Sequence, residues 1–173
     1  MARSYHVDGP VLIQVGTGTV TNNVAALETL GISEDGVDVI ISLYLEPRYS
    51  DAAGPRVPVD LQDMGQDARV RCRLFDYDEA ILEKLWIKAM GDSTFGEGGP
   101  PGQLVGTAGR TARVVLSSAD VPYRFPTAVI LGPQPFKMGT VQKRPEIEFY
   151  AWKYVAANVN TSDGIKLFDN TAA

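Results

Sequence analysis

The chain has very little of the chemistry that cross-links small proteins. One of its 173 residues is a cysteine, Cys72, and one is a histidine, His6. A single cysteine excludes an intrachain disulfide framework, and the lack of a His/Cys cluster excludes the usual ligand set for zinc. Positive charge is not in excess either, since 16 Lys and Arg residues oppose 21 Asp and Glu residues. The resulting net charge of −5 argues against a module that grips nucleic-acid phosphates.

Long hydrophobic runs are also missing. The longest apolar stretches, such as 39–41 and 129–131, are far below the roughly 20 residues of a membrane span, and the first residues form no apolar signal segment. We therefore expect no membrane association and a product made in the cytoplasm. The sequon at 160–162 is then expected to be an accident of composition.

No group of residues predicts catalysis. His6 lies in a polar terminal segment where nothing local would hold its tautomer, and a Gly-x-Ser-x-Gly elbow is missing. The Gly16-Thr17-Gly18 run lacks the third glycine and the following helix of a phosphate loop. Asp76, Asp78 and Glu79 could form an acidic cluster, but acids are also expected in the first turn of a helix. The sequence predicts no enzyme, no catalytic or metal-binding residue and no cofactor.

The composition favours one β-rich domain covering residues 1–173. Apolar residues make up 45% of the chain, and its 17 glycines and 11 prolines are spread along it. Scattered glycine and proline are typical of many turns between short strands.

Alternation of apolar and polar residues predicts about seven strands. The clearest is 37–45, and 68–74 places Cys72 on an apolar face opposite an arginine face. Pro58 confines a strand at 57–62 to the edge of a sheet. Further strands are expected at 10–15, 112–117, 127–131, 133–138 and 146–154, whereas 24–31 fits either a helical turn or a strand.

One amphipathic helix is predicted at 77–90. Asp76 is its expected N-cap, Glu79 the capping-box partner and Gly91 the stop, while the apolar stripe contains Ile81, Leu82, Leu85, Trp86 and Ala89. Many strands with a single helix favour a mainly β fold of two packed antiparallel sheets, a sandwich or barrel, with the helix at its flank. The glycine-rich segment 92–109 is expected to be a loop.

Three surfaces can each be interpreted in two ways, as structural or as functional. A long inter-strand loop at 47–58 is either floppy or reaches a neighbouring subunit. Arg69, Arg71 and Arg73 either pair with acids on a neighbouring strand or subunit, or bind phosphates. The strand face with Glu146, Glu148, Tyr150, Trp152 and Tyr154 is either packed or a sugar platform.

The order of these elements resembles phage tail tube proteins. The residues that carry the resemblance are 30–37, the strand that follows, the loop end at 54–60, the turn at 65–68 and the helix at 77–90. The order is also similar to the wider tube fold shared with type VI secretion tubes, in which two antiparallel sheets carry one flanking helix and a long loop bridges subunits.

The resemblance implies a virion protein of the phage tail. Six subunits would form a ring, and rings would stack into a tube through which genomic DNA passes without specific binding. Other expected partners are tape measure, tail terminator and baseplate or distal tail proteins, and a sheath if the tail is contractile. Residues 1–9 and 158–173 would be clasping arms. The expected subunit-interface residues are Pro47, Arg48, Tyr49, Asp51, Pro55, Arg56, Arg69, Arg71 and Arg73.

Two alternatives stay open from the sequence. Another virion component, such as a tail terminator, neck or capsid decoration protein, would have the same composition without polymerising. A carbohydrate-binding β-sandwich module would instead expose the face with Tyr150, Trp152 and Tyr154.

Overall fold

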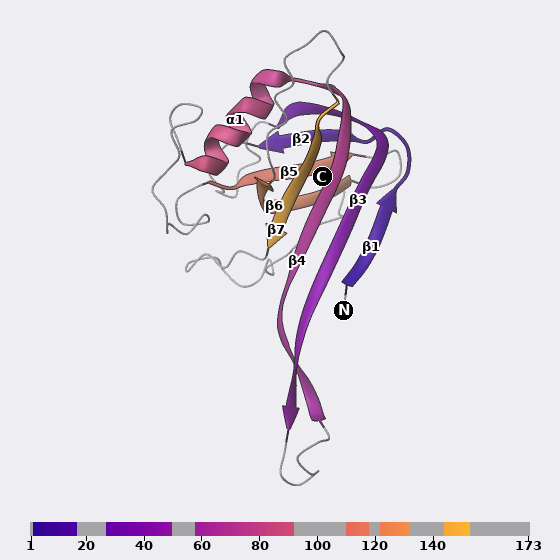
Figure 1. Ribbon diagram of the computed structural model, residues 1–173, viewed down its shortest axis with the longest axis vertical. Coiled ribbons are helices and arrows are strands. Elements are labelled where there is room, and N and C mark those ends of the chain that lie inside the picture. The colour runs from indigo at the N-terminus through magenta and orange to yellow at the C-terminus, as the bar shows by residue number, and fades with distance from the viewer. Residues whose placement is uncertain are drawn as a thin grey trace.

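A computed structural model of the chain describes residues 2–16, 27–49, 58–91, 110–117, 122–131 and 144–152. These residues form seven strands and one helix (Figure 1), so the fold is mainly β, as predicted. The helix is α1 (Glu79–Met90). The strands are β1 (Ala2–Val7), β2 (Leu12–Gly16), β3 (Glu28–Tyr49), β4 (Pro58–Tyr77), β5 (Ala112–Ser117), β6 (Pro122–Leu131) and β7 (Glu146–Trp152).

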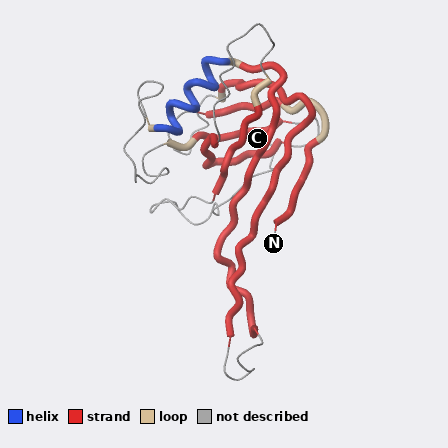
Figure 2. Tube along the Cα trace, viewed as in Figure 1, coloured by secondary structure: helices blue, strands red, loops and turns tan. Residues whose placement is uncertain are grey.

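Six of the strands close into an antiparallel barrel (Figure 2). Their order is β3-β2-β5-β6-β7-β4, and the ladder between β3 and β4 completes the ring. β1 adds to the outside by pairing with β3. The prediction of two packed antiparallel sheets, a sandwich or barrel, is therefore only partly right, since the described strands form the barrel and not the sandwich. The strands form one closed sheet because β4 pairs with β7 on one side and with β3 on the other.

β3 and β4 are longer than the sequence predicts. Glu34-Asp35-Gly36, a run typical of a tight turn, and the expected turn at 65–68 both lie inside these strands, next to shifts in the β3–β4 register. Gly36 has a φ of 100° and Gly65 a φ of 122°, values that favour glycine. A β-bulge lets a ladder absorb such residues without ending. Residues typical of turns therefore mark irregularities in these strands rather than strand ends.

The predicted loop at 47–58 is wrong at both ends. Pro47, Arg48 and Tyr49 belong to β3, and β4 begins at Pro58, which pairs with Tyr49. Pro47 is tolerated because this part of β3 forms a ladder on one side, with β4. Pro58 is the first residue of its strand, which agrees with its predicted edge position. Residues 50–57 lie outside the described part of the chain.

The other boundaries follow the prediction more closely. β5 has the predicted bounds, β6 begins earlier at Pro122, and residues 28–31 of the ambiguous segment belong to β3. The predicted strand at 133–138, the loop at 92–109, Tyr154 and the arm at 158–173 lie outside the described residues. The predicted arm at 1–9 contains β1, which pairs with residues 37–42 of β3.

The alternating apolar side chains fill the barrel, and α1 packs onto the same core. α1 contacts β3 and β6 and contributes four residues of its predicted stripe, while Ala89 is partly buried. Cys72 is a small core residue, as expected. The largest side chains in this core are Phe125, Phe149, Ile13, Leu30, Leu74, Leu116 and Ile147, together with Ile81, Leu82, Leu85 and Trp86 of the helix.

The helix begins two residues later than predicted, and its N-cap is Asp78. The Asp78 carboxylate accepts hydrogen bonds from the backbone N–H groups of Ala80 at 2.9 Å and Ile81 at 3.2 Å. Asp76, the predicted cap, is held in the β3–β4 ladder opposite Ile32. Gly91 ends the helix as expected. No helix in the described part of the chain is long and apolar enough to cross a membrane.

The capping assignment can be tested with two matched variants. We expect Asp78→Ala to lower the free energy of unfolding by about 1 kcal/mol, because two helix N–H groups lose their acceptor. Asp76→Ala should change it by less than about 0.5 kcal/mol, as is usual for an exposed position. Urea unfolding followed by circular dichroism measures both. An equal or larger loss for Asp76→Ala would contradict the assignment.

Candidate assembly interface

The β3–β4 ladder continues past the barrel as a projecting hairpin (Figure 1), made of residues 43–49 and 58–66. β1 pairs with β3 as far as Ser42, and β7 pairs with β4 only from Asp67 onward. Among the described residues, β3 from Tyr44 onward and β4 before Asp67 therefore pair with no further strand on their outer edges. Such edges carry backbone N–H and C=O groups that can pair with another strand.

One face of the hairpin is apolar, and its side chains are exposed in the described part of the structure. Residues opposite each other in a ladder share a face, and Pro47 lies opposite Leu61. Leu45 and Tyr49 occupy the same side of β3 as Pro47, by alternation. The exposed fractions are 43% for Leu45, 58% for Tyr49 and 55% for Leu61. We call these four residues the apolar face.

The opposite face of the hairpin is polar. Glu46 lies opposite Gln62 and Arg48 opposite Asp60, and the Arg48 guanidinium donates a hydrogen bond to the Gln62 side chain. The hairpin is thus amphipathic although it projects from the barrel. A two-sided polar ribbon would need no partner, whereas an apolar face of this kind is typical of a docking surface.

The apolar face continues the pattern of the barrel interior. Val37 and Val39 are buried in the core and Ile41 packs against it, and the same side of β3 then presents Leu43, Leu45 and the apolar face. The alternation of apolar residues on β3 therefore continues beyond the part of the strand that the barrel buries. Within the described residues, nothing covers the apolar side chains at the far end of this pattern.

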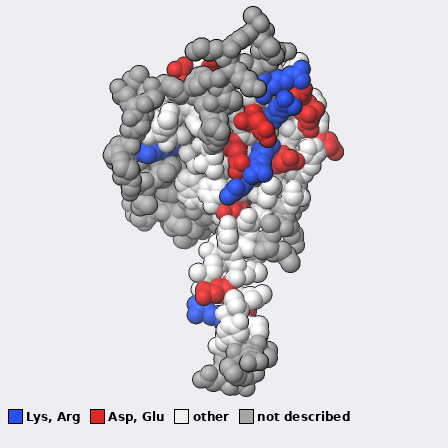
Figure 3. Space-filling model, viewed as in Figure 1, with Lys and Arg blue, Asp and Glu red and all other residues white. Residues whose placement is uncertain are grey.

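The three predicted arginines of β4 are exposed and have acidic partners in the same chain. Figure 3 shows basic and acidic side chains gathered together on one face of the molecule. Glu148 of β7 is 3.4 Å from the Arg69 guanidinium and 2.9 Å from that of Arg71. Arg73 lies 3.5 Å from Glu34 of β3, which also pairs with Arg144. The arginine face thus pairs with acids on neighbouring strands, one of the predicted outcomes. Contacts to another subunit remain a prediction.

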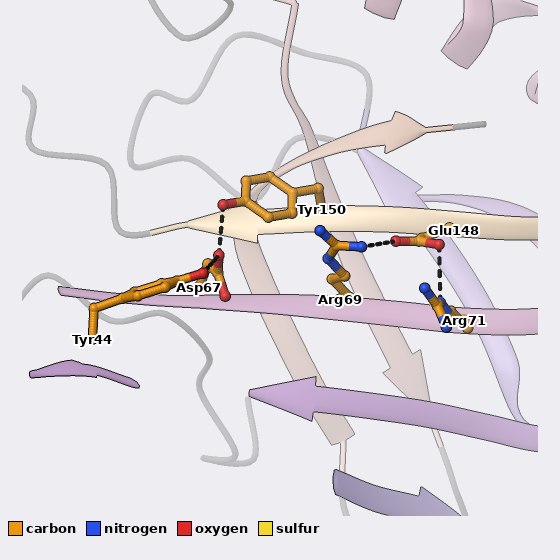
Figure 4. A network of polar contacts seen from close by, with 6 residues as sticks. All are labelled: Tyr44, Asp67, Arg69, Arg71, Glu148 and Tyr150. Atoms are coloured by element: carbon orange, nitrogen blue, oxygen red, sulfur yellow. Dashed lines mark hydrogen bonds and ion pairs between the residues drawn. The ribbon is translucent and has the colours of Figure 1, made fainter. Parts of the chain in front are cut away.

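A cluster of Tyr44, Asp67 and Tyr150 lies where the hairpin leaves the barrel (Figure 4). The phenol of Tyr44 donates to Oδ2 of Asp67 at 2.8 Å, and the phenol of Tyr150 donates to the same oxygen at 2.6 Å. Hydrogen bonding to Asp67, reinforced by burial, raises the pKa of Tyr150 to about 12 and also raises the pKa of Tyr44. Both phenols are thus held more firmly in the protonated form, in which they are donors, than ordinary tyrosines are.

The aromatic face predicted on β7 is half-buried. Tyr150 and Trp152 have ring centroids 5.9 Å apart, and the Arg69 guanidinium lies 5.9 Å from the Tyr150 ring. Ile147, Phe149 and Ala151, which alternate with these residues, are buried in the core on the other side. Asp67 was predicted only as part of a turn. Its position two residues before Arg69, on the outward face of one long strand, is the signal that could have revealed it.

The sequence offers no local group to hold the tautomer of His6, and the structure supplies Asp38 from a distant part of the chain instead. His6 lies in β1, where its Nδ1 donates to Asp38 of β3 at 2.6 Å and its Nε2 is 3.4 Å from Asp8. The hydrogen bond with Asp38 raises the pKa of His6 above 6.5. β1 is thus fastened to the edge of β3 by an ion pair as well as by its ladder.

The remaining predicted site residues lie partly on the hairpin and partly outside the described residues. Pro47, Arg48 and Tyr49 lie on the hairpin, whereas Asp51, Pro55 and Arg56 are outside the described residues. The described part of the chain contains no group of three or more His, Cys, Asp or Glu side chains that could hold a metal ion. Burial raises the pKa of the Cys72 thiol to about 12, which makes it a poor nucleophile.

Removing Glu148 tests the charge pairs on β4. We expect Glu148→Gln to lower the free energy of unfolding by up to about 1 kcal/mol at low ionic strength, because two guanidinium groups lose their negatively charged partner. The loss should shrink at high salt, because salt already weakens the two ion pairs in the unmodified protein. Glu83→Gln on the exposed side of α1 is the control. Denaturant unfolding at two salt concentrations measures both, and a salt-independent loss would contradict an electrostatic role.

The His6–Asp38 pair predicts a pH-dependent contribution of β1. Because folding raises the pKa of His6, its contribution to stability is fully present below pH 6.5 and is lost as the pH rises through the raised value. The difference in unfolding midpoint between the protein and His6→Gln should therefore shrink between about pH 6 and about pH 8. Asp38→Asn should behave like His6→Gln, and Asp60→Asn should not. A pH-independent difference would refute the pairing.

A scan of the chain against protein-family models gives no match, and a search of curated proteins gives none. The resemblance to tail tube proteins therefore stays an expectation, carried by the order of elements in the sequence.

Proposed function

We propose that the protein is a phage tail tube subunit, which assembles with copies of itself into stacked hexameric rings that conduct DNA during ejection. One structural observation carries the proposal furthest. The amphipathic β3–β4 hairpin extends an apolar face beyond the barrel, where residues of its own chain leave Tyr49 58% and Leu61 55% exposed.

The geometry of the hairpin favours contact with a second copy. When an element that projects from one subunit meets a different surface on the next, the contact is head-to-tail. Such contacts generate rings when the rotation closes and open stacks when it does not. In the described part of the chain, the outer edges of residues 44–49 and 58–66 pair with no further strand, so their backbone groups can extend a neighbouring sheet.

The charge distribution suits a conduit for DNA. The chain has a net charge of −5, and Arg69, Arg71 and Arg73 each have an acidic partner on a neighbouring strand. Cations already paired with carboxylates offer phosphates few fixed contacts, so DNA can slide instead of being held. The further partners implied by the resemblance are tape measure, tail terminator and baseplate or distal tail proteins, with a sheath in a contractile tail.

The alternatives receive less support. A sugar platform needs exposed aromatic rings, whereas Tyr150 and Trp152 are half-buried and the Tyr150 phenol already donates to Asp67. A virion component that stops at a single ring would use the same hairpin. Stacking of rings therefore separates that alternative from a tube.

Substitutions on the two faces of the hairpin test the proposal. Negative-stain electron microscopy of the purified protein over a range of concentrations should show rings with a central channel that stack into tubes. Leu61→Asp, which places a charge on the apolar face, should reduce assembly at least about tenfold, since burying an unpaired charge is strongly unfavourable. Gln62→Asp adds the same charge to the polar face and should assemble normally.

Sedimentation velocity gives the quantitative comparison between these variants, and circular dichroism checks that both fold. Equal assembly of Leu61→Asp and Gln62→Asp would show that the apolar face is not the contact. A protein that remains monomeric at every concentration, also after addition of an extract of phage tails, would contradict the proposal that it is a tail tube subunit.

A further inference from the structure

The hairpin leaves the barrel at one well-defined rung. At this rung Ala2 of β1 pairs with Ser42 of β3, Ser42 with Asp67 of β4, and Asp67 with Trp152 of β7. Four strands are therefore linked side by side at this level. Beyond it, the described ladder contains β3 and β4 alone, and a two-stranded ribbon is marginally stable by itself.

The first residues beyond this rung are irregular. The β3–β4 register shifts between Tyr44 and Leu45, and Gly65 opposite Tyr44 has a φ of 122°. The Gly65 N–H donates to the Asp63 carboxylate at 2.8 Å. Bulges bend a strand and increase its local twist. The hairpin thus has a natural bending point immediately outside the barrel.

The tyrosine–aspartate cluster lies at this bending point, because Tyr44 pairs with Gly65 and the register shift follows directly after it. Tyr44 belongs to the hairpin, Asp67 lies on the last four-stranded rung, and Tyr150 lies on β7, which takes no part in the hairpin. Both phenols converge on Oδ2 of Asp67 (Figure 4), at 2.8 Å from Tyr44 and 2.6 Å from Tyr150. The cluster therefore ties the base of the hairpin to a third strand.

The burial of Asp67 supports a geometric role. Asp67 is 6% exposed, and its second oxygen, Oδ1, has no hydrogen-bond partner among the described residues. Burying a carboxylate costs free energy that two phenols offset only in part. An apolar residue would stabilise this position more simply, whereas hydrogen bonds with fixed directions can specify one arrangement.

We propose that Tyr44, Asp67 and Tyr150 form a clamp that fixes the direction in which the hairpin leaves the barrel. When the clamp is broken, the hairpin pivots at the Gly65 bulge. The clamp's biological consequence, presenting the apolar face to a second copy at a set angle, rests on the proposed function. The effect of the clamp on the direction of the hairpin is independent of the proposed function, because all three residues belong to a single chain.

The direction of the hairpin can be measured on dilute, monomeric protein. Spin labels are attached at Asp60→Cys on the polar face of the hairpin and at Glu83→Cys on α1. Cys72 stays unlabelled because it is buried. Double electron–electron resonance then reports the distribution of label-to-label distances. The unmodified clamp should give one narrow distribution.

Removing either phenol should destroy that narrow distribution. We expect Tyr44→Phe and Tyr150→Phe to broaden it, with no more than a small change in the thermal unfolding midpoint. Tyr49→Phe removes a phenol from the same hairpin outside the cluster and should leave the distribution narrow. Asp67→Asn keeps a neutral acceptor and should give intermediate broadening, which also tests the clamp if a phenylalanine variant fails to fold.

The two claims fail separately. Narrow distributions in folded Tyr44→Phe, Tyr150→Phe and Asp67→Asn would overturn the clamp, whether or not the protein assembles. Broad distributions in variants that still form tubes as well as the unmodified protein would overturn its role in presenting the apolar face. Broad distributions with weakened assembly support both. A protein that never assembles still reveals the clamp through its distances while refuting the proposed function.

Discussion

The pairing of β3 with β4 is the interaction on which the rest of the structure depends. The ladder runs from Gly31 opposite Tyr77 to Tyr49 opposite Pro58. In its first part the flanking strands pair with β3 and β4, so the ladder closes the barrel. In its second part the same two strands continue without flanking partners in the described chain and form the hairpin. The hairpin and the barrel therefore share one backbone framework, with the bulge at Gly65 between them.

The apolar pattern of β3 explains why this framework is incomplete in a single chain. Val37 and Val39 are buried inside the barrel, whereas Leu45 and Tyr49, on the same side of the same strand, are exposed. Apolar side chains gain free energy when they leave water, so a chain that maintains this pattern beyond its own core favours an external cover. We infer that a second copy of the chain covers the apolar face. The clamp at Asp67 would then set the direction in which the hairpin approaches that copy.

The sequence predicts local features well and long-range pairing poorly. The alternation in 112–117 and 146–152 and the stripe of α1 follow from side-chain periodicity, which is a local property. The length of β3 and β4 does not follow from this periodicity, because Gly36 and Gly65 are equally suited to a turn and to a bulge inside a strand. The acidic partners of Arg69 and Arg71, and the partner of His6, come from strands distant in sequence. The convergence of Tyr44 and Tyr150 on Asp67 likewise depends on a register that composition does not encode.

Hydrogen–deuterium exchange measured as a function of protein concentration tests the central claim most directly. If the hairpin is an assembly element, amides in 43–49 and 58–66 should exchange rapidly in dilute protein and become protected as concentration rises. Barrel amides in β5 and β7 should be protected throughout. Exchange in the hairpin that stays rapid up to the highest concentration, with no larger species in solution, would contradict the account.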